Sequence, residues 1–380
     1  MNEDATKPMT ALRETALRVK QWLNDAAWPL WIAQGMDRDG LFFEQLDFAG
    51  RPDLTSCRRV RVQGRQLFTF ARALANGHEA AREPIVRGLA AIEARCWGPD
   101  GKPGWIHTLT PDGAPLDTLR DTYDQAFMLF GLTAAIGTGF EQARVLADRS
   151  IAFLDNSLAD PKAGGYFEGL PASLPRRSNP HMHMMEAMLA LHDVTGAPHW
   201  LNRATAIAAL FQKRFFDQGT GTLGEYFSRD LILAQGPSGI SVEPGHHFEW
   251  SWLLHRLAAS GGPDYRAQAN ALYGFGLRHG IGDSGFAIDE CDKFGAPLRL
   301  SRRTWPQTEL IKAHLANGAY ADAARVTNML LDSYLGTRVP GLWVDQFDAS
   351  GEARADVVPA STLYHLVVAF EDLIRVAALE

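Results

Sequence analysis

Three histidines occupy settings in this sequence that could support proton transfer. His183, His246 and His365 each lie near the start of a largely apolar stretch with helical spacing. An imidazole ionises near neutral pH, so it can both accept and return a proton under ordinary conditions. Glu186 and Glu249 follow the first two histidines by three residues, a spacing that places each pair on one helix face, where the carboxylate could orient the ring. The pattern predicts general acid/base chemistry at helix starts.

Further polar and aromatic residues occur at comparable helix starts. Sugars present both apolar faces and hydroxyl groups, so aromatic walls with a few convergent polar side chains suit a sugar pocket. The predicted substrate-binding residues are Arg65, Tyr123, Asn179, Glu186, Glu249, Trp305, Gln307 and Glu309. Two of these have a structural alternative. Arg65, inside an apolar helix, could bind a substrate oxygen or pair with a glutamate, and Trp305 could be core rather than a stacking platform.

The histidines also have alternative interpretations. Any one of them could be a core histidine bonded to its neighbour, and His181 and His247 are additional histidines beside the predicted ones. The H-x-x-E spacing resembles half of a carboxylate and histidine metal site, but the sequence contains no H-E-x-x-H motif. We therefore expect a site without a metal ion.

One short motif recurs along the whole chain and predicts the architecture that positions these residues. It consists of a glycine followed by aromatic, acidic and apolar residues, and its six copies are GLFFEQLD from Gly40, GWIHTLT from Gly104, GGYFEGL from Gly164, GTLGEYF from Gly221, GFAIDECD from Gly285 and GLWVDQFD from Gly341. Subtracting successive starting positions gives 64, 60, 57, 64 and 56 residues. A period near 60 residues indicates a repeat architecture, and each copy is typical of a short strand or hairpin.

Two kinds of helix are predicted between consecutive motif copies. Amphipathic segments with a charged face suit an outer layer, and they cover 11–23, 81–95, 141–155, 198–215, 264–278 and 319–334. Segments that are apolar nearly all round suit an inner layer, and they cover 58–75, 120–136, 181–194, 245–257, 305–316 and 360–375. The sequence thus predicts an all-α (α/α)6 barrel of six inner and six outer helices, with short β-hairpins on one face. We expect residues 1–380 to form a single catalytic domain.

The composition limits the partners of this barrel. A net charge of -7 and a pI near 6.0 provide no basic surface for nucleic acid. Three widely spaced cysteines, a charged first segment and the lack of a long apolar run lead us to expect a cytoplasmic chain that does not enter the membrane. No P-loop motif is present, so we expect neither a nucleotide nor another cofactor. A small sugar is the expected partner, and a homo-oligomer remains open.

The motifs around these residues resemble the N-acylglucosamine 2-epimerase superfamily, which includes mannose isomerases and cellobiose 2-epimerases. The resemblance covers nearly the whole chain. It is carried by VQGRQ around Arg65, NPHMHMMEA around His183, PGHHFEWSWLL around His246, WPQTE around Trp305 and ASTLYH around His365. It implies an (α/α)6 barrel, in agreement with the repeat count.

The resemblance also implies roles for individual residues. His246 and His365 match the family's acid/base pair, His183 its third active-site histidine, and Arg65 the arginine near the reactive end of the sugar. Cellobiose epimerases tend to have lysine and proline before the tyrosine–histidine pair, whereas this chain has Ser361, Thr362 and Leu363. This departure favours a monosaccharide isomerase.

We therefore expect an aldose–ketose isomerase that interconverts D-mannose and D-fructose through a cis-enediolate, without a metal. The alternative is a 2-epimerase acting on glucose, mannose or an N-acylhexosamine, because both reactions begin with removal of the C2 proton. A glycoside hydrolase would instead need two catalytic carboxylates, for which the sequence offers Asp124, Glu186, Glu249 and Glu309. A noncatalytic carbohydrate-binding or regulatory protein is a further alternative.

Overall fold

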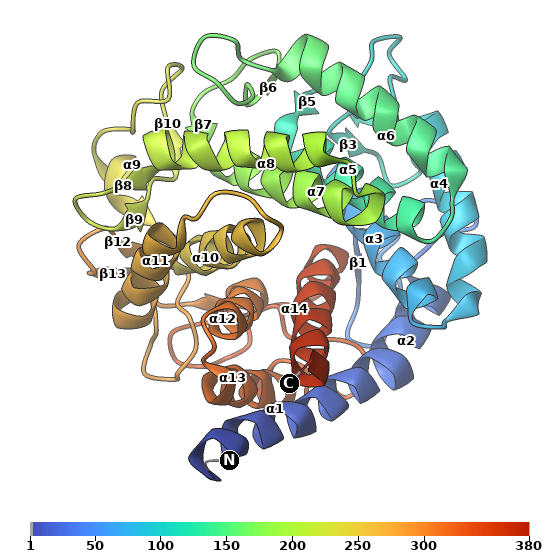
Figure 1. The fold of residues 1–380 in the computed structure, drawn as a ribbon. Helices are drawn as coiled ribbons and strands as arrows, with labels where there is room; N and C mark the ends of the chain where they lie inside the picture. Colours follow the sequence, from blue (N-terminus) through green and yellow to red (C-terminus); the bar gives the residue numbers. More distant parts are fainter. Residues whose placement is uncertain (1–2, 380) are drawn as a thin grey trace.

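Two concentric rings of helices surround a common axis in the computed structural model, which describes residues 3–379 (Figure 1). The outer ring consists of α1 (Glu3–Trp22), α4 (Arg82–Cys96), α6 (Glu141–Phe153), α8 (Pro198–Leu210), α11 (Arg266–His279) and α13 (Tyr320–Ser333). The inner ring consists of α3 (Val60–Ala75), α5 (Thr122–Gly137), α7 (Asn179–Thr195), α10 (Pro244–Ala259), α12 (Thr304–Ala316) and α14 (Ala360–Leu379). Outer and inner helices alternate along the chain, which confirms the predicted (α/α)6 barrel.

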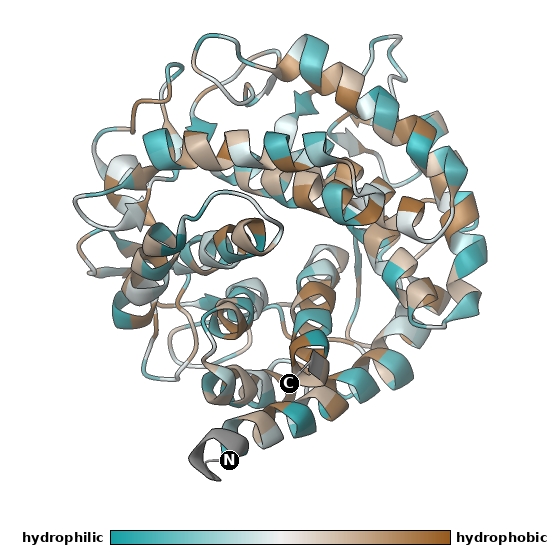
Figure 2. Ribbon diagram, viewed as in Figure 1, coloured by the Kyte–Doolittle hydropathy of each residue, from teal (hydrophilic) through white to brown (hydrophobic). Residues whose placement is uncertain are grey.

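Burial separates the two rings as the sequence pattern predicted. In the outer helix α4, the buried residues include Ile85, Leu89 and Ile92, which recur at helical spacing along one face. The inner helix α5 is buried along most of its length. Outer helices such as α1 and α6 accordingly show alternating hydrophilic and hydrophobic stretches in Figure 2. Among the described residues, no helix has the length and apolar character needed to span a membrane.

The outer ring departs from the predictions at several helix ends. Helix α1 begins at Glu3 rather than near residue 11. Its first part is polar, so the sequence pattern contains no apolar periodicity there, but adding residues to an existing helix costs little free energy. Three outer segments end in π-helical turns, namely η1 (Leu23–Ala27), η3 (Leu154–Leu158) and η4 (Phe211–Phe215). Three further short helices were not predicted: α2 (Trp28–Gln34), η2 (Glu79–Ala81) and α9 (Pro237–Ile240).

Each motif copy contains a short strand, as expected, but its partner lies outside the copy. The motif strands are β1 (Gln45–Leu46), β3 (Thr108–Leu109), β6 (Gly169–Leu170), β10 (Tyr226–Phe227), β12 (Glu290–Asp292) and β15 (Gln346–Phe347). They pair antiparallel, in this order, with β16 (Val358–Pro359), β2 (Arg58–Arg59), β5 (Arg120–Asp121), β7 (Arg176–Arg177), β11 (Ser241–Val242) and β14 (Arg302–Arg303). Every one of these partner strands leads into an inner helix, so all the pairs lie at the same end of the barrel.

Local hairpins supplement these pairs. Strands β4 (Pro115–Asp117) and β13 (Pro297–Arg299) extend two of the pairs to three strands, and β8 (Phe216–Asp217) forms a separate pair with β9 (Thr222–Leu223). The pairing of β1 with β16 joins the first repeat to the last and closes the ring.

Main-chain hydrogen bonds attach the motif to the inner helix that it supports. The first N–H of α5, at Thr122, donates to the carbonyl of Glu168, and equivalent bonds begin α3 and α14. Helix α10 begins instead with Pro244, which has no N–H to donate. The acidic position of the motif is thereby held beside the inner helix start, where the predicted site residues lie.

Close backbone approach brings α3 and α5 together on one side of the barrel. A Cβ atom added at Gly64 would lie 2.4 Å from the Phe127 carbonyl oxygen, and one added at Gly131 would lie 2.2 Å from the Gly64 carbonyl oxygen. Both positions require glycine for this contact. The contact sets the distance between Arg65 on α3 and the residues that α5 contributes to the site.

Candidate active site

Equivalent positions of the six inner helices form a continuous ring of side chains around the barrel axis. We call it the lower ring, and it consists of Arg65, Phe127, His183, Glu249, Glu309 and His365. Neighbours around it contact one another: the Arg65 guanidinium lies 3.9 Å from the Phe127 ring centroid, and the His183 and Phe127 centroids are 4.4 Å apart. All six residues are buried. Three of the predicted substrate-binding residues, Arg65, Glu249 and Glu309, and two of the three predicted catalytic histidines belong to this ring.

A second ring lies one helical turn closer to the strands. This upper ring consists of Arg61, Tyr123, Asn179, Gly245, Trp305 and Ser361. Its members are half-buried, apart from the buried Gly245. Exposure thus rises from the lower ring to the upper ring, so a substrate would reach the buried groups from the strand end of the barrel.

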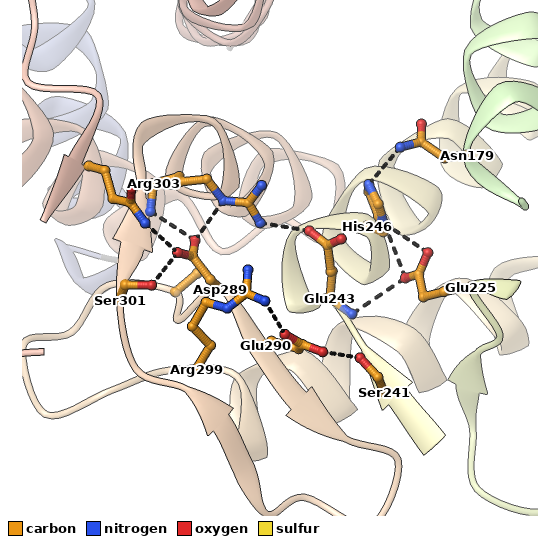
Figure 3. Close-up of polar contacts among 12 residues, drawn as sticks. Asn179, Glu225, Ser241, Glu243, His246, Asp289, Glu290, Arg299, Ser301 and Arg303 are labelled. Carbon is orange, nitrogen blue, oxygen red and sulfur yellow. Dashed lines mark hydrogen bonds and ion pairs between the residues drawn. The ribbon is translucent and has the colours of Figure 1, made fainter. Parts of the chain in front are cut away.

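His246 follows Gly245 and is held by a carboxylate from a different repeat. Its Nδ1 lies 3.0 Å from Glu225 Oε2, and its Nε2 lies 3.2 Å from the Asn179 amide (Figure 3). We expected Glu249 to orient this ring, and that prediction is wrong, because Glu225 takes the position. Burial disfavours the charged imidazole, but the charges of Glu225 and Glu243 outweigh it and raise the pKa of His246 to about 9. The ring therefore carries a proton at neutral pH.

The protonated state of His246 has a consequence for Asn179. With Nδ1 donating to Glu225, the proton on Nε2 needs an acceptor. The Asn179 Oδ1 atom is buried and has no hydrogen-bond partner. Rotation of this amide by half a turn presents that oxygen to His246, or a substrate oxygen can take its place.

His365 lies across the site from His246 and has the opposite electrostatic environment. Its Nδ1 lies 2.9 Å from Glu309 Oε1. Burial, together with the positive charges of Arg65 and Lys312, holds the pKa of His365 well below its usual value. The ring is therefore neutral, and because Nδ1 donates to Glu309, Nε2 is left as a basic nitrogen.

His183 is neutral for a similar reason. Its Nδ1 lies 3.1 Å from Glu186 Oε2, as the three-residue spacing predicted, and the Tyr364 hydroxyl donates to the same oxygen at 2.5 Å. Burial lowers the pKa of His183 to about 4. Burial opposes the charge on Glu186, but the bonds from His183 lower the pKa of that carboxyl to about 2. Glu186 therefore positions His183 from below.

Glu249 differs from the other carboxyl groups of the site. It is fully buried, and neither carboxyl oxygen has a hydrogen-bond partner. Burial and the charge of Glu309 raise its pKa well above the usual value. A protonated carboxyl at this position can donate a hydrogen bond to a substrate oxygen.

Arg65 has no carboxylate partner among the described residues. Its guanidinium donates to the Tyr123 hydroxyl at 2.8 Å and to the Ser361 carbonyl at 3.1 Å, and its Nε is buried without a partner. The structural alternative, an ion pair with a glutamate, is therefore not observed. An unpaired buried cation is available to a negatively charged oxygen.

Trp305 lies between His246, whose pKa is raised, and His365, whose pKa is lowered. Its ring centroid lies 5.1 Å from that of His246 and 5.8 Å from that of His365. A Cβ atom at Gly245 would lie 2.5 Å from the Trp305 ring, so only glycine permits this position of the indole. The half-buried indole lies between the two histidines and forms a wall of the site.

Gln307 is turned away from the site, although the sequence analysis placed it among the substrate-binding residues. Its amide accepts from the Ala287 N–H at 2.7 Å and donates to the Ala287 carbonyl at 2.9 Å, which ties it to the fifth motif copy ahead of strand β12. Gln63 and Gln125 bind the main chain of their own motif copies in the same way.

His181 and His247 occupy the position equivalent to Gln307 in their own repeats. Each accepts a motif N–H at Nε2, from Tyr166 and Leu223 respectively. Burial lowers the pKa of both rings to about 4. These two histidines support the fold, which distinguishes them from His183 and His246.

A cavity lies at the opposite end of the barrel. It has a volume of about 840 Å³ and a floor that includes Phe68, Phe130 and Trp252. The charged residues around it pair with one another, as Arg72 does with Glu371 and Arg256 with Asp193. His246 and His365, whose pKa values are shifted in opposite directions, lie at the strand end of the barrel, so the candidate active site lies there and not in this cavity.

Sequence reasoning missed Glu225, Lys312 and Tyr364 as parts of the site. Glu225 is the acidic residue of the fourth motif copy, so the regular placement of that position beside an inner helix was the available signal. Lys312 follows Glu309 by three residues, the same spacing that was recognised for the histidines.

Comparison with known proteins shows the family to which the chain belongs. The family model for N-acylglucosamine 2-epimerase matches residues 40–369. The chain is 35% identical over 370 residues to a mannose-6-phosphate isomerase of Rhizobium meliloti, which covers 93% of this chain and 95% of the relative. It is 28% identical over 317 residues to a D-mannose isomerase of Thermobifida fusca, covering 77% of each.

A solved structure has the same fold over nearly the full length. The cellobiose 2-epimerase of Spirochaeta thermophila superposes with a TM-score of 0.85 at 22% identity, covering 97% of this chain and 98% of that one. Repeats, barrel and matched residues agree on the relationship: the chain is an enzyme of the sugar isomerase and 2-epimerase type and belongs to the N-acylglucosamine 2-epimerase family.

Proposed function

We propose that this enzyme interconverts D-mannose and D-fructose by histidine acid/base catalysis without a metal ion. One observation carries the proposal: His246 and His365 lie on either side of Trp305 and have pKa values displaced in opposite directions. When two titratable groups in one site have pKa values shifted in opposite directions, one is an acid and the other a base at the same pH. The name of the Thermobifida fusca relative supports D-mannose as the substrate.

The first steps follow from the protonation states. Protonated His246 donates to the ring oxygen of the bound pyranose as the bond between C1 and that oxygen breaks, while the anomeric hydroxyl releases its proton to solvent and C1 becomes the aldehyde carbon. Neutral His365 then removes the C2 proton at Nε2. The electron pair of the broken C–H bond forms the C1–C2 double bond, and the carbonyl electrons move to O1.

The charge that develops on oxygen needs stabilisation. The Arg65 guanidinium, which has no carboxylate partner among the described residues, is suited to the enediolate oxygens, and Glu249, whose raised pKa favours the protonated form, can donate a further hydrogen bond. His365 returns its proton to C1 while a proton moves from O2 to O1, and the product is the ketose. His183, fixed by Glu186, would bind a substrate hydroxyl beside this centre.

The runner-up is 2-epimerisation of glucose, mannose or an N-acylhexosamine. It is favoured by the presence of His246 opposite His365, because epimerisation requires a proton to return to the other face of C2. The two reactions share the enediolate and differ in where the proton returns.

The contacts of the carboxylates do not favour glycoside hydrolysis. Asp124 is bonded to Arg61 and to His107 at 3.0 and 2.5 Å, and Glu309 is bonded to His365. Glu186 accepts a hydrogen bond from His183, and of the four candidates only Glu249 has no hydrogen-bond partner for either carboxyl oxygen among the described residues. A hydrolase needs two carboxyl groups free to act on one bond.

We further propose that residues 1–380 act as one catalytic domain in the cytoplasm, with a small sugar as the partner and no cofactor.

The test is a product analysis. The purified enzyme is incubated with D-mannose in deuterated buffer containing a chelator, and the sugars are identified by NMR. We expect D-fructose that carries some solvent deuterium at C1. Formation of D-glucose alone would establish the epimerase instead. If mannose is unchanged while a mannose disaccharide is cleaved, or if no sugar reacts, the isomerase proposal is overturned.

A further inference from the structure

Lys312 lies among the buried carboxyl groups beneath the candidate active site. Its side chain is fully buried, and its Nζ lies 2.5 Å from Glu309 Oε2. Nζ also lies 3.9 Å from the centroid of the Trp252 ring, which covers it on the side of the opposite cavity. A fully buried lysine remains charged only when nearby negative charges offset the cost of removing its ammonium group from water.

The surrounding groups supply that reason. Glu309 lies on the same helix, Glu249 faces it from α10, and Glu186 and His183 face it from α7. His365 and Tyr364 approach from α14, and Arg65 approaches from α3. Burial and the charge of Glu309 disfavour ionisation of Glu249, while the charge of Glu309 raises the pKa of Lys312 in spite of its burial. Lys312 is therefore the cation that allows buried carboxylates to remain ionised here.

The two oxygens of Glu309 connect this cation to the base. Oε2 contacts Lys312, while Oε1 contacts His365 Nδ1. An ionised Glu309 can only accept at Oε1, so Nδ1 of His365 must carry the imidazole proton and Nε2 must be free of one. A protonated Glu309 could donate instead, which would reverse the tautomer and leave a proton on the nitrogen that must accept one.

We propose that Lys312 is a positioning residue for catalysis, which acts through Glu309 to hold His365 in the tautomer whose Nε2 is the base. This inference rests on the proposed function, since it assumes that His365 removes the substrate proton. Lys312 itself does not touch the substrate. Lys312 keeps Glu309 ionised, and ionised Glu309 keeps the imidazole proton of His365 on Nδ1.

The test uses Lys312→Met, which keeps the length of the side chain and removes its charge. Burial already raises the pKa of Glu309, and loss of the ammonium raises it further. Glu309 in the variant therefore gains its charge only as the pH rises. We expect kcat at neutral pH to fall by about 10²-fold or more, with little change in KM, and to recover partly as the pH is raised from about 7 to about 9.

Two further variants isolate the route through Glu309. Glu309→Gln should be slow at every pH in that range, and the double variant Lys312→Met/Glu309→Gln should be no slower than Glu309→Gln alone, because the lysine has lost the group through which it acts. Lys293→Met is the matched control. This lysine pairs with Asp217 outside the site, and its loss should leave the pH profile unchanged.

An infrared measurement separates this proposal from the proposed function. The spectrum of Lys312→Met minus that of the double variant should contain the C=O band of a protonated carboxyl at neutral pH, and the corresponding wild-type difference against Glu309→Gln should lack it. This result does not depend on which sugar reacts.

Three results would overturn the proposal: a Lys312→Met enzyme with a flat pH profile, additive effects in the double variant, or the absence of the carboxyl band. If the spectrum has the band but the wild type acts on no sugar, the proposed function fails and the charge relationship stands. Circular dichroism establishes that each variant is folded. If Lys312→Met does not fold, Lys312→Gln takes its place in every comparison.

Discussion

His246 Nδ1 lies 3.0 Å from Glu225 Oε2, although the two residues come from different repeats. The motif acid of one repeat thus sets the charge of a histidine at the start of the next inner helix. The neighbouring motif acid Glu168 occupies the same position but binds Arg177. The same position of the repeated motif therefore has a structural role in the third copy and a catalytic role in the fourth.

The first prediction concerns the pH dependence of Glu225→Gln. The pKa of His246 is raised, so its acid form is present below about pH 9 and is lost above it. Removing the charge of Glu225 should lower that pKa and move the alkaline limb of the kcat profile down by roughly 1–3 pH units. Glu168→Gln is the matched control and should leave the limb in place. An alkaline limb that does not move in Glu225→Gln would show that His246 is not the acid.

The second prediction compares adjacent histidines. His247 accepts the Leu223 N–H at the helix position where Gln63 and Gln307 serve in other repeats. We expect His247→Gln to keep that bond and to retain both the fold and kcat. His246→Gln should lose about 10²–10⁴-fold in kcat. Equal losses in steady-state assays of the two variants would refute the division between a supporting and a catalytic histidine.

The third prediction tests the wall of the site. In Gly245→Ala the new methyl group would meet the Trp305 ring at 2.5 Å, so the indole must move. We expect a loss of about 1–3 kcal/mol in the free energy of unfolding and a lower kcat/KM. Gly274→Ala, in the outer helix α11, meets only the end of the Arg278 side chain at 3.4 Å and should be neutral or stabilising. Denaturant unfolding and sugar kinetics check both variants, and unchanged kinetics in Gly245→Ala would contradict the placement of Trp305.

The fourth prediction is that chelation leaves activity intact. The Arg65 guanidinium supplies the positive charge that the enediolate requires, and Glu249, whose raised pKa favours the protonated form, supplies a further hydrogen-bond donor. Initial rates should be equal before and after dialysis against EDTA. Loss of activity that one divalent cation restores would replace the proposed mechanism with a metal-assisted one.

The repeated pattern made the barrel predictable from the sequence. Six motif copies and two alternating helix types define (α/α)6 geometry without any knowledge of long-range contacts. The pairing of His183 with Glu186 was predictable too, because a three-residue spacing on a helix is a local relationship.

The other partners of the site depend on contacts that spacing does not contain. His246 has a glutamate three residues later, yet it pairs with Glu225, which lies directly before strand β10, 21 residues earlier in the chain. Gln307 has the right residue type at an inner helix start, but its direction on the helix sends the amide to the Ala287 backbone. Lys312 was not predicted because the sequence alone does not distinguish a lysine in a buried ion pair from one on the surface.

The fifth prediction tests the central claim, which is that His365 is the base. In His365→Asn, the bond to Glu309 can be retained while the basic Nε2 is lost. The decisive measurement is kcat for D-mannose isomerisation by His365→Asn, with mannose binding measured by calorimetry on the same preparation. We predict that kcat falls about 10²–10⁴-fold while the dissociation constant changes little. A His365→Asn enzyme with near-normal kcat would contradict the account.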